Sequence, residues 1–338
     1  MSLRVSKPGL LTTIQDLGRH GLQHLGIVPC GAMDAVAHRV ANSLVGNPVS
    51  AATLECTVVG PELVFLRDSL VALYGAVFEA RIGREPFPVN RPVMVRSGAV
   101  LSTGNAVRGA RAYLAIAGGF DVPEILGSRS TYLPANFGGY GGRALKAGDV
   151  LAAAQDLKAL SEQRFSRMAR KPTLAKPQFE SVRWSAPELT LPFGGIVAAR
   201  VLEGRHWEQF DAASREAFLG ETWRVSPDSN RMGYRLSGPR LTRAKSVEIL
   251  SEPTCLGTVQ VPNDGTPIAL MADHQTTGGY PKIAEIAGAD IPGLAQLAPG
   301  GSVRFVKCTL GEAQAARREA QERLGQVEQA IAWELGRK

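Results

Sequence analysis

Three segments of the sequence are dense in amide, hydroxyl and glycine residues, the groups from which polar binding sites are built. They are PGLLTTIQDLGRHGLQHLG at 8–26, GSRSTYLPANFGGYGG at 127–142 and QVPNDGTPIALMADHQTTGGYPK at 260–282. In the third segment, ADHQTTGGY follows an apolar run of strand length, so its polar residues are expected in a loop at the end of a strand. Such loops are where a rigid scaffold presents catalytic groups.

The expected catalytic residues lie in this loop. His274 and Asp273 offer an imidazole and a carboxylate, the ingredients of general acid–base catalysis, and Gln275 completes the candidate set. Adjacent residues often point apart, so a structural role for His274 stays open. Gly278 and Gly279 allow a ligand to approach backbone N–H groups closely.

The expected substrate-binding residues come from all three segments. Arg129, flanked by hydroxyls and glycines, is suited to clamp a carboxylate or phosphate, although it is equally suited to brace its own loop. We expect a single pocket where residues 8–26 meet residues 260–282. The binding set is Gln15, Asp16, Arg19, Arg129, Thr277, Gly278, Gly279 and Tyr280.

The composition favours a mainly β protein with two domains. The 338 residues include 37 glycines and 21 prolines but only 20% charged residues, which suits a turn-rich chain better than a helical bundle. The net charge of +7 is spread along the sequence, so no nucleic-acid partner is predicted. The four cysteines form no C-x-x-C pair, and neither a metal site nor a disulfide framework is expected. The N-terminus lacks the apolar core of a signal peptide, and no apolar run has membrane-spanning length, so we expect a cytoplasmic protein without a membrane partner.

Strands and a few helices must position these residues. Helices are predicted at 34–44 and 211–218, each capped by an aspartate, and along the C-terminal tail at 311–335. Short apolar runs predict strands at 63–66, 70–74, 112–117, 196–202, 247–250, 267–271 and 303–306.

The two capped helices open a weak internal repeat. Gly60-Pro61 and Gly238-Pro239 follow the two caps at nearly equal spacing, although chance similarity between strands with Gly/Pro turns remains an alternative. The expected organisation is an N-terminal barrel at 1–155, a linker at 156–190, a C-terminal barrel at 191–310 and a helix at 311–338.

Several catalytic signatures are missing. The sequence has no G-x-x-x-x-G-K-[ST] loop for ATP, no G-x-S-x-G elbow, no H-E-x-x-H pair and no biotin-carrying lysine in an Ala-Met-Lys-Met setting. If the reaction uses ATP or biotin, we expect those functions wholly or partly on another chain.

From Val5 to Phe305 the sequence resembles a family known as KipA-like proteins, allophanate hydrolase subunit 2, the carboxyltransferase domain of urea carboxylase, and the C component of 5-oxoprolinase. The motifs that carry the resemblance are PGLLTTIQDLGRHGLQHLGI, GAMD, ANSLVGN, LECTVVGPEL, YLAIAGGFDVPEILGSRST, SNRMGYRLSGPRL, SEPTCLGTVQVPNDGTPIALMADHQTTGGYPKIA and DIPGLAQLAPGGSVRF. The resemblance implies two tandem cyclophilin-like β-barrel domains.

For function, the resemblance implies first the C component of an ATP-dependent 5-oxoprolinase, which opens 5-oxo-L-proline to L-glutamate. ATP is then a co-substrate, bound here or on a partner, and the implied partners are a KipI-like B component and a LamB/YcsF-type A component of the 5-oxoprolinase. The second reading is a carboxyltransferase subunit that moves a carboxyl group from carboxybiotin to a urea-like amide. A KipA-type regulatory binding protein is the third. Because no biotin carboxylase or carrier segment is visible, we expect a stand-alone subunit rather than urea carboxylase itself.

Overall fold

The computed structural model describes residues 1–154, 177–190, 195–244 and 249–336. These residues form two compact units. The first comprises Met1–Gly18, Asp34–Leu191 and Arg323–Lys338, and the second comprises Arg19–Met33 and Pro192–Glu322. The segment at 19–33 therefore belongs with the second half of the chain, although it precedes the first α-helix. Most of the expected linker at 156–190, namely residues 156–176, lies outside the described residues.

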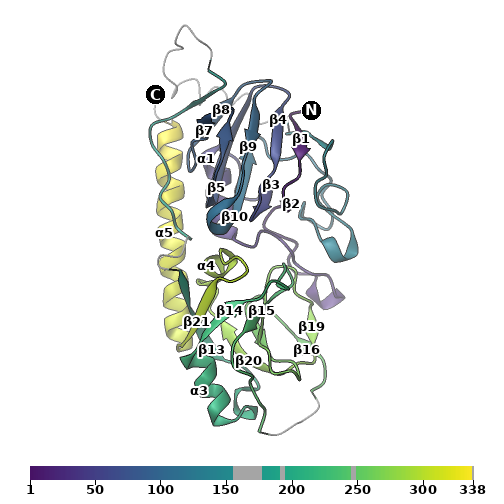
Figure 1. The fold of residues 1–338 in the computed structure, drawn as a ribbon, viewed down its shortest axis with the longest axis vertical. Helices are drawn as coiled ribbons and strands as arrows, with labels where there is room; N and C mark the ends of the chain where they lie inside the picture. The colour runs from purple at the N-terminus through teal and green to yellow at the C-terminus, as the bar shows by residue number, and fades with distance from the viewer. Residues whose placement is uncertain (155–176, 191–194, 245–248, 337–338) are drawn as a thin grey trace. The chain divides into compact units, whose positions relative to one another are not determined.

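The described strands of the first unit form two six-stranded sheets (Figure 1). The first sheet has the order β11 (Val150–Leu151), β1 (Leu3–Lys7), β4 (Glu62–Phe65), β9 (Val100–Ser102), β6 (Arg81–Ile82) and β7 (Glu85–Pro86). The second has the order β12 (Phe179–Ser181), β8 (Val93–Val95), β5 (Ser69–Phe78), β10 (Ala106–Ile116), β3 (Thr53–Thr57) and β2 (Leu11–Gln15). A short 3-10 helix, η2 (Leu133–Ala135), lies in the loop after β10.

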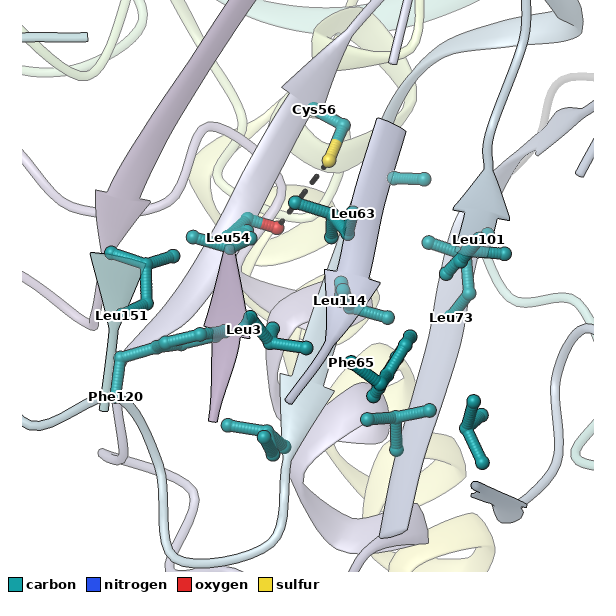
Figure 2. Packing of buried hydrophobic residues seen from close by; sticks show 14 of the residues in the cluster. Leu3, Leu54, Cys56, Leu63, Phe65, Leu73, Leu101, Leu114, Phe120 and Leu151 are labelled. Carbon is teal, nitrogen blue, oxygen red and sulfur yellow. Dashed lines mark hydrogen bonds between the residues drawn. The ribbon is translucent and has the colours of Figure 1, made fainter. Parts of the chain in front are cut away.

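The core of this unit is apolar and draws on both sheets. Figure 2 shows leucines from β1, β3, β4, β5, β9 and β10 converging with Phe65 and Phe120. The Cys56 thiol lies among them, 4.0 Å from the carbonyl oxygen of Leu54, and burial raises its pKa to about 12. This thiol is therefore a neutral packing group.

Helix α1 (Ala35–Leu44) packs on the second sheet of the same unit. As predicted, Asp34 caps it, because an Asp34 carboxylate oxygen accepts a hydrogen bond of 2.9 Å from the Ala37 N–H. Gly75 in β5 makes the close approach possible. With φ at +118°, a Cβ there would lie 2.6 Å from the Arg111 carbonyl oxygen and 3.4 Å from the Ala37 side chain.

The second unit is built around a closed seven-stranded barrel. Its strand order is β13 (Ile196–Glu203), β20 (Lys282–Ile286), β17 (Thr258–Gln260), β18 (Ile268–Leu270), β15 (Gly233–Ser237), β14 (Thr222–Val225) and β21 (Ser302–Lys307). The barrel closes because β13 pairs in parallel with β21, from Ile196 opposite Ser302 to Val201 opposite Lys307. A separate two-stranded ribbon joins β16 (Glu252–Pro253) to β19 (Thr277–Gly278).

The helices agree with the sequence prediction. Asp211 caps α3 (Ala212–Gly220) by accepting from the Ser214 N–H at 2.7 Å, and Phe218 of that helix stacks on Phe305 with ring centroids 4.6 Å apart. The tail forms α5 (Leu310–Gly336). The other described helical segments are α4 (Ile291–Ala295), η1 (Gln23–Leu25) and η3 (Trp207–Gln209). The prediction of a mainly β chain with a few short helices and a C-terminal helix is confirmed.

The strand predictions are confirmed at six of the seven runs. The run at 247–250 falls partly on residues 247 and 248, outside the described part of the chain. No helix in the described ranges is both long and apolar enough to cross a membrane.

The internal repeat holds for three strands. In both units the strand before the Gly-Pro turn pairs with a strand later in the same unit, and that later strand pairs in turn with a third. The order is β3–β10–β5 in the first unit and β15–β18–β17 in the second. The outer pairings differ, since β1 meets β11 antiparallel whereas β13 meets β21 in parallel. Among the described strands, seven of those in the second unit form a closed barrel, whereas those of the first unit form two six-stranded sheets.

Candidate functional site

The candidate residues are divided between the two units. Gln15, Asp16 and Arg129 belong to the first unit, whereas the second contains Arg19, Asp273, His274, Gln275, Thr277, Gly278, Gly279 and Tyr280. Each unit therefore carries a polar cluster of its own.

In the first unit, Asp16 anchors the GSRST loop. Its carboxylate accepts hydrogen bonds from the Ser128 hydroxyl at 2.6 Å, the Ser130 hydroxyl at 2.5 Å, the Arg129 N–H at 2.5 Å and the Gly18 N–H at 2.8 Å. Burial opposes the negative charge, but these four donors outweigh it and lower the pKa of Asp16. The carboxylate is thus charged at neutral pH, and its oxygens accept hydrogen bonds from neighbouring loop residues of the same unit.

The Arg129 side chain contacts residues a few positions earlier in the sequence. Its guanidinium lies 3.0 Å from Glu124 and its Nε donates to the Val122 carbonyl oxygen at 3.2 Å, with 39% of the side chain exposed. The loop-bracing role considered from the sequence is therefore present in the geometry. A role as an anion clamp would require this exposed pair to open, which costs little.

Gln15 is fully buried beside this loop. Its amide nitrogen donates to the Thr131 carbonyl oxygen at 3.3 Å and to the Thr13 hydroxyl at 3.0 Å. Its amide oxygen is buried and has no hydrogen-bond partner among the described residues. A buried acceptor of this kind is able to receive a donor from a ligand.

A further buried network lies behind these residues, and sequence reasoning missed it. The Tyr113 hydroxyl donates to Glu55 at 2.7 Å and accepts from the Asp34 N–H at 2.8 Å. Burial, with the charges of Glu55 and Asp34 adding to it, raises the pKa of Tyr113 well above its usual range. The available signal was Glu55 itself, the one charged residue in the buried strand TLECT.

His38 joins the same interior as a neutral group. Its Nε2 faces the Val49 carbonyl oxygen at 3.0 Å and its Nδ1 faces the Thr53 hydroxyl at 2.9 Å. Since a carbonyl oxygen only accepts, Nε2 carries the proton. Burial lowers the pKa of His38 to about 4, against the opposing effect of the Asp16 carboxylate.

His38 makes stability depend on pH. Because its folded-state pKa of about 4 lies below the ordinary 6.5, the unfolded chain binds more protons between these values. The contribution of neutral His38 to the free energy of unfolding is therefore complete above pH 6.5 and is lost as the pH falls toward 4. It amounts to about 3 kcal/mol. We expect the thermal unfolding midpoint to fall over this window, and to fall less steeply in His38→Gln. An identical pH slope in the variant would contradict this assignment.

In the second unit, Asp273 is bound in a buried ion pair with Arg231. Two carboxylate oxygens meet Nε and Nη2 of the guanidinium at 2.9 Å each, and Nη2 also donates to the Gly31 carbonyl oxygen at 2.6 Å. Cys30 lies beside this ion pair. Burial raises the pKa of the Cys30 thiol to about 12, and the charge of Asp273 adds to this effect, whereas the charge of Arg19 opposes it. Arg19 and Asp273, both named from the sequence, thus act on the same thiol.

His274 is neutral in this environment. Its Nδ1 lies 2.7 Å from the Gln275 carbonyl oxygen, so Nδ1 carries the proton, and the Thr254 hydroxyl donates to the same carbonyl oxygen. Burial lowers the pKa of His274. The hydrogen bond to Gln275 and the charge of Asp273 raise it, but by less, so the net shift is downward. The unprotonated Nε2 is therefore the atom available to act as a base, and that catalytic role stays a prediction.

Amide groups continue the cluster next to His274. The Gln275 amide nitrogen donates to the Gln260 amide oxygen at 3.1 Å, and the Gln260 amide nitrogen is buried without a hydrogen-bond partner among the described residues. Gly278 packs directly on these amides, because a Cβ there would lie 2.7 Å from Gln260 Nε2 and 3.3 Å from Gln275 Nε2. Gly278 was predicted to let a ligand approach the backbone. In the structure its missing side chain leaves room for the amide groups of Gln260 and Gln275.

Thr277, Gly279 and Tyr280 surround this point. Thr277 pairs with Pro253 across the β16–β19 ribbon, and Gly279 lies beside the 249–251 backbone. The Tyr280 side chain is 48% exposed.

Lys282 supplies a buried cation to the same cluster. It lies opposite Gln260 in the β17–β20 pairing, and its ammonium donates to the Pro253 carbonyl oxygen at 2.5 Å and pairs with Glu252 at 3.0 Å. Because an ammonium has three N–H groups, one has no acceptor among the described residues. His206 accepts from the Lys282 backbone N–H at 3.1 Å and faces Glu252 at 3.6 Å.

A thiol and a carboxyl group extend the cluster along β20. The Glu285 carboxyl group accepts from the Thr258 hydroxyl at 2.8 Å and from the Cys255 thiol at 3.4 Å. Burial raises the pKa of Glu285 despite these hydrogen bonds and the nearby Lys282 charge. Burial likewise raises the pKa of Cys255.

We define the barrel cluster as Glu252, Thr254, Gln260, His274, Gln275, Gly278 and Lys282. It combines an amide donor, a cation and a neutral imidazole, which suits recognition of an amide oxygen or a carboxylate. Within the described residues, no group of three or more His, Cys, Asp and Glu side chains is placed to hold a metal ion.

Residues 25–307 match the family described as carboxyltransferase domain, subdomain A and B. The chain belongs to this carboxyltransferase family. The whole barrel cluster lies within the matched residues, whereas Gln15, Asp16 and Arg19 precede them.

The relatives include proteins of two names. The chain is 39% identical to the C component of the Escherichia coli K12 5-oxoprolinase, over 98% of both chains, and 37% identical to that of Haemophilus influenzae, over 94% of this chain and 95% of the relative. It is also similar to the crystal structure of Kluyveromyces lactis urea carboxylase, with a TM-score of 0.85 and 33% identity. That match covers 98% of this chain but 29% of the larger enzyme.

Sequence reasoning missed four members of the barrel cluster as individual site residues: Glu252, Thr254, Gln260 and Lys282. All four lie in the motif SEPTCLGTVQVPNDGTPIALMADHQTTGGYPKIA, and the available signal was a lysine between Pro281 and the apolar Ile283. A cation within a buried strand is rarely there without a partner or a function.

Proposed function

We propose that this chain is the C component of an ATP-dependent 5-oxoprolinase complex. The observation that carries the proposal is the 39% identity to the C component of the Escherichia coli 5-oxoprolinase over 98% of both chains. The reaction consumes 5-oxo-L-proline, ATP and water and yields L-glutamate, ADP and phosphate. The proposed partners are a KipI-like B component and a LamB/YcsF-type A component, with ATP bound on this chain or on a partner.

The barrel cluster supports this substrate class. 5-Oxoproline carries a carboxylate and a ring amide, and the cluster offers a lysine N–H without a protein acceptor among the described residues and the unpaired amide nitrogen of Gln260. We assign Lys282 to bind an anionic oxygen and Gln260 to donate to an amide oxygen. The neutral His274 is assigned the movement of a proton through Nε2, with Gln275 and Thr254 holding its ring.

A carboxyltransferase subunit acting on a urea-like amide is the second candidate. The structural similarity to Kluyveromyces lactis urea carboxylase favours it. A urea-like substrate presents the same polarised amide oxygen but no carboxylate. Carboxybiotin would then have to come from another chain, since this sequence has no biotin-carrying lysine motif.

Reconstitution separates these functions. We expect the purified chain alone to release negligible ADP in the presence of 5-oxoproline, because it has no P-loop for ATP. Addition of both partner subunits is expected to restore ADP release that depends on 5-oxoproline. Coupled detection of ADP and glutamate measures both products.

Two outcomes would contradict the proposal. One is rapid 5-oxoproline-dependent turnover by the isolated chain. The other is carboxylation of urea, without 5-oxoproline cleavage, when the chain is mixed with a biotin carboxylase and a carboxybiotin carrier.

A further inference from the structure

His206 lies just after the point where the first strand of the barrel leaves its neighbour. β13 pairs with β20 as far as Glu203, which lies opposite Ala284 (Figure 1). At the next residue, Gly204, a Cβ would lie 2.4 Å from the Lys282 carbonyl oxygen, so any side chain there would clash with β20. This close crossing brings His206 to Lys282, the first residue of β20.

Both main-chain polar groups of Lys282 are hydrogen-bonded to His206. The His206 N–H donates to the Lys282 carbonyl oxygen at 3.0 Å, and the imidazole Nδ1 accepts from the Lys282 N–H at 3.1 Å. Trp207, the next residue, packs in the barrel core and anchors this segment. On its other side β20 pairs with β17, where Gln260 lies opposite Lys282. The backbone at the base of the Lys282 side chain is therefore held between His206 and β17.

The second nitrogen of the imidazole faces the counter-ion of Lys282. Because Nδ1 accepts from an N–H, the neutral ring carries its proton on Nε2. Nε2 lies 3.6 Å from Glu252 Oε1, and the same oxygen lies 3.0 Å from the Lys282 ammonium nitrogen. Burial lowers the pKa of His206. The charge of Glu252 raises it, but by less, so the ring is neutral at pH 7.

The position of Glu252 affects where the remaining N–H of Lys282 points. Two N–H groups of the ammonium are directed at the Pro253 carbonyl oxygen and at Glu252, and once two are fixed the direction of the third follows. The other oxygen of Glu252 lies 3.3 Å from Arg205, whose side chain is 77% exposed, and such an exposed pair is weak. The His206 side chain, 8% exposed, is the better-ordered neighbour of Glu252.

We propose that His206 is a positioning residue for the Lys282 ammonium. It holds the Lys282 backbone through its own N–H and Nδ1, and it holds Glu252 through Nε2–H, so that one ammonium N–H is directed at the substrate. The inference rests on the proposed function, in which Lys282 binds an anionic oxygen of the substrate. In this role His206 acts through Lys282 and, unlike His274, exchanges no proton with the substrate.

Substitution of His206 in the reconstituted complex tests this role. His206→Leu removes both imidazole contacts and is expected to lower kcat/KM for 5-oxoproline by about 10- to 100-fold, because misplacing a binding group by about 1 Å has an effect of this size. His206→Asn keeps an acceptor near the place of Nδ1, and His206→Gln keeps a donor near the place of Nε2. Each is expected to retain more activity than His206→Leu.

A double-mutant cycle separates positioning from a general loss of structure. If His206 acts through the ammonium, His206→Leu should lower kcat/KM by less than about twofold further in the Lys282→Met background. The matched control is His38→Leu, which removes a buried imidazole from the first unit. This control is expected to lower the melting temperature but to keep kcat/KM within about twofold of the wild type, in assays run well below every melting transition.

The outcomes separate this inference from the function on which it rests. A wild-type kcat/KM in His206→Leu, an additive loss in the Lys282→Met background, or an equal loss in His38→Leu would overturn the positioning role alone. Equal losses in all three His206 variants would overturn it as well. Carboxylation of urea with a biotin carboxylase and a carboxybiotin carrier, without 5-oxoproline cleavage, would reject the proposed function, and the same cycle measured on urea would then decide the role of His206. A wild type that turns over neither substrate would reject both.

Discussion

Replacement of Lys282 by methionine is expected to lower kcat/KM for 5-oxoproline by about 100- to 1000-fold in the reconstituted complex, the range for loss of one preorganised donor in a water-poor site. The Lys282 side chain is 7% exposed, and its two acceptors among the described residues, the Pro253 carbonyl oxygen and Glu252, leave one of its three N–H groups uncommitted. Methionine has a similar length but no charge and no donor. Steady-state assay of ADP release over a range of 5-oxoproline concentrations measures the loss.

The control is Lys307→Met, which removes a solvent-exposed lysine that pairs with Glu203 on the same barrel. We expect kcat/KM to stay within about twofold of the wild type, because an exposed ion pair contributes little. Thermal unfolding of both variants distinguishes catalysis from folding. If Lys282→Met loses turnover only in proportion to a lower melting temperature, Lys282 is a structural residue; if it retains kcat/KM, the barrel cluster is not the substrate site.

Local features of the fold were predictable because their causes lie close together in the sequence. Asp34 and Asp211 each cap a helix by accepting from an N–H three residues later, and the apolar runs became strands. Barrel closure was not predictable in this way. It depends on the parallel pairing of Ile196 with Ser302, which no spacing within either strand reveals.

The same distinction applies to the candidate residues. The segment at 260–282 was identified from its density of polar groups, and Gln260, His274, Gln275 and Lys282 do lie together there. The interactions of individual residues depended on distant partners that the sequence left open. Asp16 meets its hydroxyl donors more than 100 positions away.

Asp273 was named from the sequence as a catalytic carboxylate, and its position beside Arg231 leads to a different expected phenotype. Asp273→Asn should lower the melting temperature of the protein by roughly 10 °C, because breaking a buried ion pair costs about 3–5 kcal/mol. Asparagine keeps the shape of the side chain but leaves the Arg231 guanidinium, 4% exposed, without its counter-charge. Differential scanning calorimetry measures the shift.

The matched control is Glu62→Gln, which neutralises the exposed pair with Lys7 and is expected to move the melting temperature by only about 1 °C or less. A double variant, Arg231→Met with Asp273→Leu, should recover much of the lost stability, since apolar replacement removes both charges together. A catalytic Asp273 would behave in the opposite way: Asp273→Asn would lose turnover at an unchanged melting temperature, and the double variant would recover nothing. The hydrogen bond from Arg231 to the Gly31 carbonyl oxygen favours the structural outcome, because it makes the ion pair an anchor for the buried segment at Cys30.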